Sequence, residues 1–235
     1  MMRPLPPDTL RMPLALVVAL AAAACQGLIP GASRDAPRLY ELTPKSTFDP
    51  ALPRVRSQLV VEVPDSASGL QTSRIAVKQK PTTLDYYARS EWTDLAPRLV
   101  QTKIIESFEN SGKIVSVGRE GSGLRSDYVL KSELRHFEAQ LYESEKPLIR
   151  IVVNVKLVRM PAREIVANRS FERTWPVESA NIDQLVAGFD EALGAVMKRI
   201  VEWTIREMDM RERGIIHNLP GRGRPVIRRG EPPPE

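Results

Sequence analysis

The clearest hydrophobic pattern in the chain is an alternation of apolar and polar positions at 148–160. Apolar side chains occupy every second position there, and most positions between them are polar: Ile149, Ile151, Val153, Val155 and Leu157 alternate with Arg150, Asn154 and Lys156. Successive side chains of a β-strand point to opposite faces of the sheet. The alternation therefore predicts a long strand with one buried and one exposed face, as is common in antiparallel sheets.

Related patterns flank this segment. At 128–137, apolar residues again alternate with charged ones, and at 164–175 we expect one shared apolar face, formed by Ile165, Ala167, Phe171 and Trp175. The residues at 161–163 form a short turn between the second and third segments. These three segments predict an antiparallel meander. Two earlier β-branched or apolar runs, at 59–63 and 74–79, predict shorter strands.

Two segments instead follow the helical period. The first covers 94–110, with Thr93 or Asp94 as its expected N-cap, Pro97 in its first turn and Ser111-Gly112 as its stop. Its core-facing stripe consists of Ala96, Leu99, Val100, Ile104, Ile105 and Phe108. The second helix begins after Asn181, where Gln184 completes a capping-box pattern. Its stripe consists of Leu185, Phe189, Ala192, Val196, Ile200 and Trp203.

Taken together, the elements predict an α+β domain. The expected order is ββαβββα, with a mostly antiparallel sheet and two helices packed on one of its faces. We place this domain at 39–210, between a short linker rich in proline and small residues and a Pro/Gly/Arg-rich tail at 211–235. The composition of the tail predicts that it is disordered.

The first 24 residues have the features of a signal peptide. Arg3 and Arg11 form a basic start, and positions 14–24 are an uncharged run of eleven residues, too short to span a bilayer, which needs about 20. Three alanines at 22–24 then precede Cys25, the only cysteine of the chain. The pattern resembles the bacterial lipobox, which implies that cleavage leaves Cys25 as the acylated first residue. The alternative is an ordinary secretory signal cut near Ala24 or Gly27.

The lipobox resemblance also implies a location. Gln26, and not aspartate, follows Cys25. By the sorting rule of Gram-negative lipoproteins, this implies a lipid anchor at 25–38 in the inner leaflet of the outer membrane, with the domain facing the periplasm. Several acyl chains, each contributing about 0.8 kcal/mol per buried methylene, would hold the protein on the membrane.

The net charge does not indicate a nucleic-acid partner. The formal charge of +5 includes +1 from residues 1–24 and +2 from the last 22 residues. Only about two positive charges remain on the domain itself, too few for the basic face that binding to phosphate backbones requires. The basic tail could make weak electrostatic contact with anionic lipid, or simply be solvated.

The chain gathers no set of residues typical of an enzyme. Its two histidines, His136 and His217, lie in a charged strand and in the tail, and the motifs of serine hydrolases, P-loops, zinc proteases and CxxC redox sites are missing. The glycines at 118, 121 and 123 fit a hairpin turn, and Glu143 and Glu145 fit a solvated hairpin tip. We therefore expect no catalysis, no metal and no cofactor.

One group of residues suggests a contact site. Tyr86, Tyr87 and Trp92 lie in a segment that we expect to be a loop before the first helix. Rigid aromatic side chains in a loop suit binding to a partner or to lipid. The alternative is that the three rings cover the end of the sheet and pack against the start of the helix.

Several short motifs follow one another at a recognisable spacing. Tyr40-Glu41-Leu42-Thr43-Pro44 comes soon after Cys25, and later motifs follow in order: Tyr86 or Tyr87, Trp92, Pro97, Leu99, Ser111-Gly112 and a short strand ending at Val117. In this order the chain, from about Cys25 to Met208, resembles the ABC-type transport auxiliary lipoproteins that accompany Mce-domain lipid transporters.

The resemblance implies an outer-membrane lipoprotein that works with an Mce-domain protein and an ABC permease and ATPase. Its role would be that of a docking or receiving component without catalysis. A structural envelope lipoprotein that activates or scaffolds a cell-wall enzyme is the main alternative, and a hydrolase is a more remote one. Whether the chain forms a homo-oligomer stays open.

Overall fold

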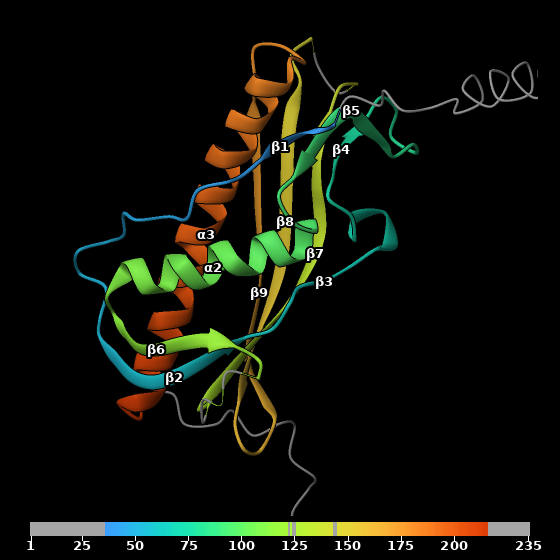
Figure 1. Ribbon diagram of the computed structural model, residues 1–235. Helices are drawn as coiled ribbons and strands as arrows, with labels where there is room; N and C mark the ends of the chain where they lie inside the picture. Colours follow the sequence, from blue (N-terminus) through green and yellow to red (C-terminus); the bar gives the residue numbers. More distant parts are fainter. Residues whose placement is uncertain (1–35, 122, 124–125, 143–144, 216–235) are drawn as a thin grey trace, which may run out of the picture. The chain divides into compact units, whose positions relative to one another are not determined.

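Three long antiparallel strands dominate the sheet of the computed structural model, which describes residues 36–121, 123, 126–142 and 145–215 (Figure 1). They are β7 (Tyr128–Gln140), β8 (Leu148–Arg159) and β9 (Glu164–Pro176), and β8 pairs with both of the others over its whole length. The odd-numbered residues of β8 from Ile149 to Leu157 are completely buried, whereas Lys156 is exposed. The predicted meander is confirmed, and so is the buried face at 148–160, but the opposite face is not generally exposed, because Val152, Asn154 and Val158 are also buried.

The other edge of β7 is shared by three short strands, all parallel to it. β2 (Val55–Val61) lies beside the beginning of β7, β3 (Asp65–Ser66) beside its middle and β4 (Arg74–Lys78) beside its end. One long strand therefore aligns a succession of short ones. A 3-10 turn, η2 (Ser68–Leu70), lies between β3 and β4.

Three more strands widen the sheet. β6 (Ile114–Arg119) pairs in parallel with β2, β5 (Asp85–Trp92) pairs antiparallel with β4, and β1 (Arg38–Tyr40) pairs in parallel with β5. The sheet is therefore mixed, and the prediction of a mostly antiparallel sheet is wrong. What remains of that prediction is the α+β class with two helices, α2 (Ala96–Ser111) and α3 (Ile182–Glu212).

The predicted order ββαβββα is also wrong. The observed order is β1, β2, β3, η2, β4, β5, α2, β6, β7, β8, β9, α3. The missed strands carry no apolar period, because β1 and β3 are only three and two residues long and β5 is largely polar. Parallel pairing depends on which distant segments a crossover brings together, and local alternation does not encode that.

Two β-bulges decide which side chains reach the core. An irregularity between Leu134 and His136 lets Leu134 and Phe137 both face inward, although three positions separate them. Another, between Leu157 and Val158, pairs Val158 with Ile165. Ile165 is consequently 57% exposed. The expectation that it shares an inward face with Phe171 and Trp175 is wrong, because a bulge shifts the alternation by one residue.

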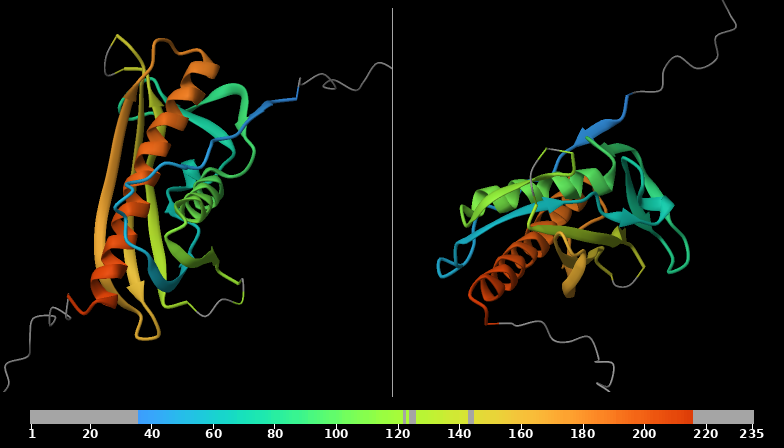
Figure 2. Two further views of the ribbon diagram at one scale, coloured as in Figure 1. Left: turned by 90° about the vertical axis from the view of Figure 1, so that its left-hand side faces the viewer. Right: turned by 90° about the horizontal axis from the view of Figure 1, so that it is seen from below.

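Both helices cover the same side of the three long strands, and α3 runs along β8 and β9 (Figure 2). The predicted stop of α2 is confirmed, since Gly112 adopts the left-handed conformation, with φ 59°, that ends the helix. Its predicted start is wrong by one or two residues. The N-cap is Leu95, and neither Thr93 nor Asp94 caps the helix with its side chain.

The start of α3 agrees with the sequence more closely. The side chain of Asn181 accepts a hydrogen bond from the backbone N–H of Asp183, at 2.9 Å. The reciprocal half of the expected capping box is missing, because Gln184 accepts a hydrogen bond from Ser179 and the N–H of Asn181 donates to that same serine. Asn181 is therefore the N-cap, without a capping box.

At its other end α3 runs to Glu212, two residues beyond the domain boundary expected at 210. The carboxylate of Glu212 accepts hydrogen bonds from the backbone N–H groups of Arg56 and Ser57, and so holds the beginning of β2. The last turn of the helix thus belongs to the domain. The signal peptide, Cys25 and the tail beyond Ile215 lie outside the described residues.

The centre of the core is a cluster of three aromatic rings from separate elements. Trp92 of β5 meets Phe189 of α3 edge to face at a centroid distance of 5.2 Å, and Phe137 of β7 lies 5.7 Å from Trp92 and 5.0 Å from Phe189. All three side chains are at most 1% exposed. Trp92 therefore joins the strand layer to the helix layer.

Gly188 lets α3 approach the sheet closely. A Cβ at this position would lie 2.4 Å from Cγ1 of Val177 and 2.9 Å from Cγ1 of Ile149. The other glycine of this helix, Gly194, has no such constraint, because its nearest neighbour would be Cδ of Lys45 at 3.9 Å. The two glycines therefore allow a matched comparison.

We expect Gly188→Ala to lower the free energy of unfolding by about 1–3 kcal/mol, because the added methyl group overpacks the interface between α3 and β8. Helix propensity alone would favour alanine by about 1 kcal/mol. Gly194→Ala should therefore raise stability. Urea unfolding of both variants measures the difference, and stabilisation by both substitutions would contradict the close approach.

Trp92→Ala should lower the free energy of unfolding by about 3 kcal/mol or more, as expected for loss of a buried aromatic side chain. Trp92→Phe should cost much less. The indole N–H of Trp92 has no hydrogen-bond partner among the described residues, so phenylalanine loses volume only. Thermal melting compares the two variants, and equal, small losses would show that Trp92 does not join the two layers.

Candidate functional site

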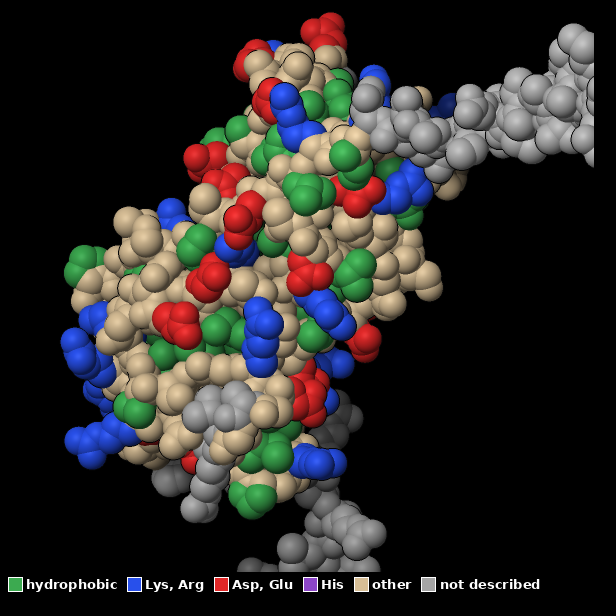
Figure 3. Space-filling view, in the orientation of Figure 1, with side chains coloured by type: hydrophobic (Ala, Val, Ile, Leu, Met, Phe, Trp, Pro, Cys, Tyr) green, Lys and Arg blue, Asp and Glu red, His purple; other side chains and the backbone are tan. Residues whose placement is uncertain are grey.

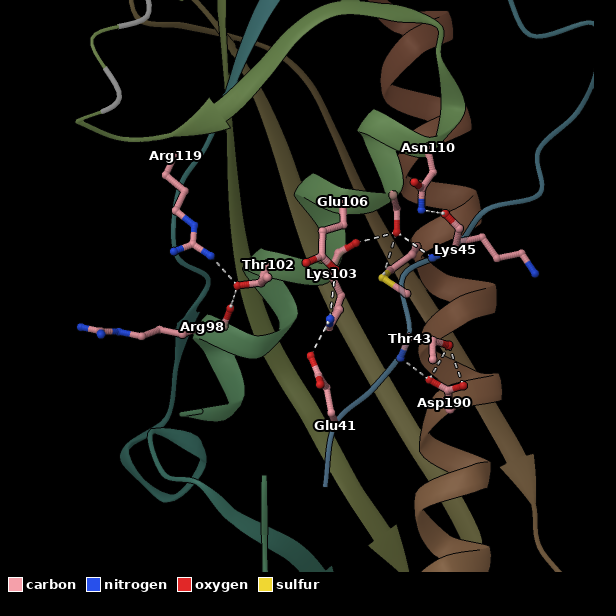
Figure 4. Close-up of polar contacts among 12 residues, drawn as sticks. Glu41, Thr43, Lys45, Arg98, Thr102, Lys103, Glu106, Asn110, Arg119 and Asp190 are labelled. Carbon is pink, nitrogen blue, oxygen red and sulfur yellow. Dashed lines mark hydrogen bonds and ion pairs between the residues drawn. The ribbon is translucent and has the colours of Figure 1, made fainter. Parts of the chain in front are cut away.

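The segment that follows the expected lipid anchor is tied to both helices by polar contacts (Figure 4). The backbone N–H of Thr43 donates to Asp190 of α3 at 2.6 Å, and the hydroxyl of Thr43 also donates to that carboxylate. Two residues later, the N–H of Lys45 donates to Ser107 of α2 at 2.9 Å, and its carbonyl accepts from Asn110. This segment, residues 41–45, therefore bridges α2 and α3, and we call it the attached segment.

A buried cation reinforces this attachment. Lys103 of α2 is only 5% exposed, and its ammonium donates to Glu41 at 3.1 Å and to Glu106 at 3.0 Å. Burial by itself lowers the pKa of Lys103, but hydrogen bonds and charge attraction from Glu106 and Glu41 outweigh it and raise the pKa above its ordinary value. Lys103 therefore stays charged at neutral pH and holds Glu41 against α2.

The three aromatic residues that suggested a contact site were expected in a loop. They lie instead in strand β5. Trp92 is buried in the core cluster, so it offers no surface to a partner or to lipid, and the structure favours the packing alternative for this residue. Tyr86 and Tyr87 are half-buried. The hydroxyl of Tyr86 donates to the carbonyl of Gly69 at 3.0 Å, and Arg74 stacks over its ring.

The helix-free face of the sheet carries an apolar hollow of about 560 Å³ at one end. Its floor is a small hydrophobic cluster separate from the main core, formed by Val60, Val129, Val158 and Met160. Ile165, turned outward by the bulge in β9, stands in the wall. A volume of this size lies in the range of small-ligand and docking pockets, about 300–1,000 Å³.

Charged side chains surround the hollow. Lys131 and Glu62 form an ion pair of 2.9 Å at its rim, where Arg119 and Arg163 also lie. Lys131 is shared with a second, polar hollow of about 620 Å³ lined by Ser66, Glu133, Asn154 and Lys156, among others. The face therefore changes from apolar to polar along β7, and we call the apolar end, defined by its four floor residues and Ile165, the sheet-face hollow.

Farther along β7 lies a buried carboxylate. Glu138 is 2% exposed and lies 2.8 Å from Nδ1 of His136 and 3.6 Å from Nζ of Lys78. Its second oxygen accepts the backbone N–H of Phe137 at 2.8 Å. Contacts to several donors stabilise a buried charge, so this cluster has the features of a structural ion-pair network.

Among the residues that the structure describes, no three His, Cys, Asp or Glu side chains are grouped to hold a metal ion. His217 and Glu143 lie outside the described residues, and Gly118 belongs to strand β6. Neither described helix is long and apolar enough to cross a bilayer. The sheet-face hollow can accommodate an apolar group beneath a charged rim.

Sequence reasoning missed the sheet-face hollow. Val129 and Val158 are apolar residues on the strand faces that also carry Lys131 and Lys156, and this is the signal that could have revealed a second apolar cluster. Ile165 could not be found in this way, because its outward direction depends on the bulge.

Comparisons with known proteins relate the chain to one family. The family model described as "ABC-type transport auxiliary lipoprotein component" matches residues 40–201. A crystal structure of a protein from Xanthomonas campestris is similar at 31% identity with a TM-score of 0.71, over 74% of this chain and 98% of that one. A second crystal structure, of an uncharacterised protein, shares the fold at 12% identity with a TM-score of 0.57, over 72% of this chain and 99% of that one.

A curated relative from Bradyrhizobium diazoefficiens, itself uncharacterised, is 26% identical over 169 residues, or 71% of this chain. The chain spans less than half of that relative, 44% of its length. The family match, by contrast, extends from β1 into α3 and so includes the attached segment, the whole sheet and α2. The chain belongs to the ABC-type transport auxiliary lipoprotein family.

Proposed function

We propose that the protein is an auxiliary lipoprotein of an ABC/Mce-type intermembrane lipid transport system, anchored in the outer membrane and facing the periplasm. In this role it is a docking or receiving component of the system and performs no catalysis. The observation that carries the proposal is the family match from residue 40 to 201, which begins fifteen residues after Cys25. The partners of this role are an Mce-domain protein and an ABC permease and ATPase.

The attached segment supports an anchoring role. The contacts of Thr43 with Asp190 and of Glu41 with Lys103 hold the beginning of the domain against both helices. A chain that leaves the domain at this point is fixed to its core sixteen to eighteen residues after the expected acylation site. The domain would therefore stay folded and firmly attached while a partner binds elsewhere on its surface.

The sheet-face hollow supports a docking role. It lies on the face that neither helix covers, and its apolar floor beneath charged side chains resembles the centre and rim of a protein interface. We assign the apolar contact with the Mce-domain partner to this hollow. Ile165 is its most exposed large apolar residue, so it is the position at which to test the assignment.

Cys25→Ser should leave the domain folded but without its lipid anchor, because the thiol serves acylation and not the core. Metabolic labelling with radioactive palmitate and membrane fractionation measure this. The wild type should be labelled and fractionate with outer membranes, and globomycin should block its processing. A wild type that takes up no label would contradict the lipid anchor at Cys25.

Ile165→Asp should lower recovery of the Mce-domain partner about tenfold or more, because a charge in the apolar centre of an interface removes a main binding contact. Val115→Asp is the matched control, since Val115 is 66% exposed on β6 and does not line the hollow. Thermal melts establish that both variants fold.

Quantitative co-purification from cross-linked cells separates the outcomes of this test. Equal recovery by the two variants would place docking elsewhere on the domain. A wild type that recovers a cell-wall synthase and no Mce-domain protein would overturn the transport role in favour of a structural envelope lipoprotein.

A further inference from the structure

Where β9 meets α3, the surface carries a row of arginines stacked on aromatic rings. Arg169, Phe171, Arg173 and Trp175 follow at every second position of β9, so they share the side that faces α3. The guanidinium of Arg173 lies 5.1 Å from the ring centre of Trp175. Those of Arg169 and of Arg199, from α3, each lie 5.5 Å from the ring centre of Phe171.

These three arginines are exposed, and their charge is not neutralised locally. No carboxylate of the described residues lies within 4 Å of any of their guanidinium groups. The nearest acidic side chains along both elements have other partners, since Glu172 pairs with Arg150 and Glu202 lies 3.8 Å from Lys198 and 3.9 Å from Arg206. In the described part of the chain, the only hydrogen bond that these three side chains make runs from Arg199 to the carbonyl of Glu172.

Stacking fixes the direction of each guanidinium while leaving most of its N–H donors available. Phe171, beneath Arg169 and Arg199, is 1% exposed, whereas Trp175 and Trp203 are half-buried. Arginines beside half-buried tryptophans are the combination that suits a membrane–water interface, where phosphate groups lie next to apolar chains. A row from 169 to 175 spans about 20 Å of strand, which is wide enough for several lipid headgroups.

We propose that this edge, formed by Arg169, Arg173, Arg199 and the two tryptophans, rests on an anionic phospholipid surface and orients the domain on its membrane. The proposal depends on the lipid anchor and not on the identity of the transport partner. The phosphate groups of the lipids would accept hydrogen bonds from the guanidinium groups.

The length of the linker permits this orientation. Twelve residues separate Cys25 from Arg38, and fully extended they reach about 40 Å. Arg38 contacts Asp183 in the first turn of α3 at 3.3 Å. Arg199 follows Asp183 by sixteen residues of helix, or about 24 Å. The membrane that holds the acyl chains is thus within reach of the whole row of arginines.

The simplest alternative is that the stems of the arginines only shield Phe171 and Trp175. Methionine separates the two roles, because it retains an apolar stem and removes the charge. The test uses the unlipidated chain from Gln26 to Glu235 with vesicles of phosphatidylethanolamine and phosphatidylglycerol at 3:1, and vesicles of phosphatidylcholine for comparison. The matched control is the double variant R54M/R56M, which removes two exposed arginines from the beginning of β2.

We expect the wild type to co-sediment with the anionic vesicles and to dissociate as salt is raised. R169M/R173M should bind about twenty-five-fold more weakly, since each cation near an anionic surface contributes about fivefold. R169K/R173K, which keeps the charge, should bind far better than the methionine variant. R54M/R56M should bind like the wild type, and all variants should melt at similar temperatures.

Three results would overturn the proposal. Equal losses in R169M/R173M and R54M/R56M would show that only net charge matters. Binding that survives R169M/R173M but disappears when the chain stops after Ile215 would assign the contact to the tail. If R169M/R173M binds the vesicles like the wild type but no longer binds the Mce-domain partner, the arginines bind an acidic protein surface. Failure of the transport role alone would leave all the vesicle results unchanged.

Discussion

The fold depends on a single strand, β7, that pairs with β8 along the whole of one edge and with three short strands on the other. β7 is thirteen residues long, and β8 occupies one of its edges while β2, β3 and β4 divide the other. Strands of two to seven residues have little stability of their own, and they persist because β7 supplies backbone partners to each of them in turn. The hydrophobic face of β7 then requires the cover that α2 and α3 provide, and the aromatic cluster around Phe137 fastens that cover in place.

The sequence predicts those parts of the fold that obey one local period over a long stretch. The meander at 128–176 and the buried stripes of both helices are of this kind, and so are the glycine stop of α2 and the N-cap of α3. The short strands expected at 59–63 and 74–79 are observed as β2 and β4, but their parallel pairing was not predicted, and β1 and β3 are too short to show any period. The direction of Ile165 was also lost, since a bulge moves a side chain to the other face without changing the residues around it.

Site prediction from the sequence depended on the same limits. The aromatic residues before α2 were expected in a loop, but they lie in the polar strand β5, and Trp92 lies in the core. The sheet-face hollow and the arginine row combine residues from distant segments, namely β2 with β7 and β8, and β9 with α3. Only pairing and packing bring such residues together. The family relationship could be predicted from the sequence because it rests on the order of short motifs, which requires no knowledge of the sheet.

Two arginines of α3 affect how readily the open edge of β9 can pair with a strand of another copy. β9 pairs only with β8 within the described residues, so one of its edges is open, yet Arg211 and Arg199 donate hydrogen bonds to the carbonyls of Val166 and Glu172. Membrane anchoring confines molecules to two dimensions, where they collide far more often than in solution. An unguarded edge of thirteen residues would then invite strand-to-strand polymerisation. Because both carbonyls already accept hydrogen bonds from α3, this edge offers a strand of a second copy two fewer free acceptors.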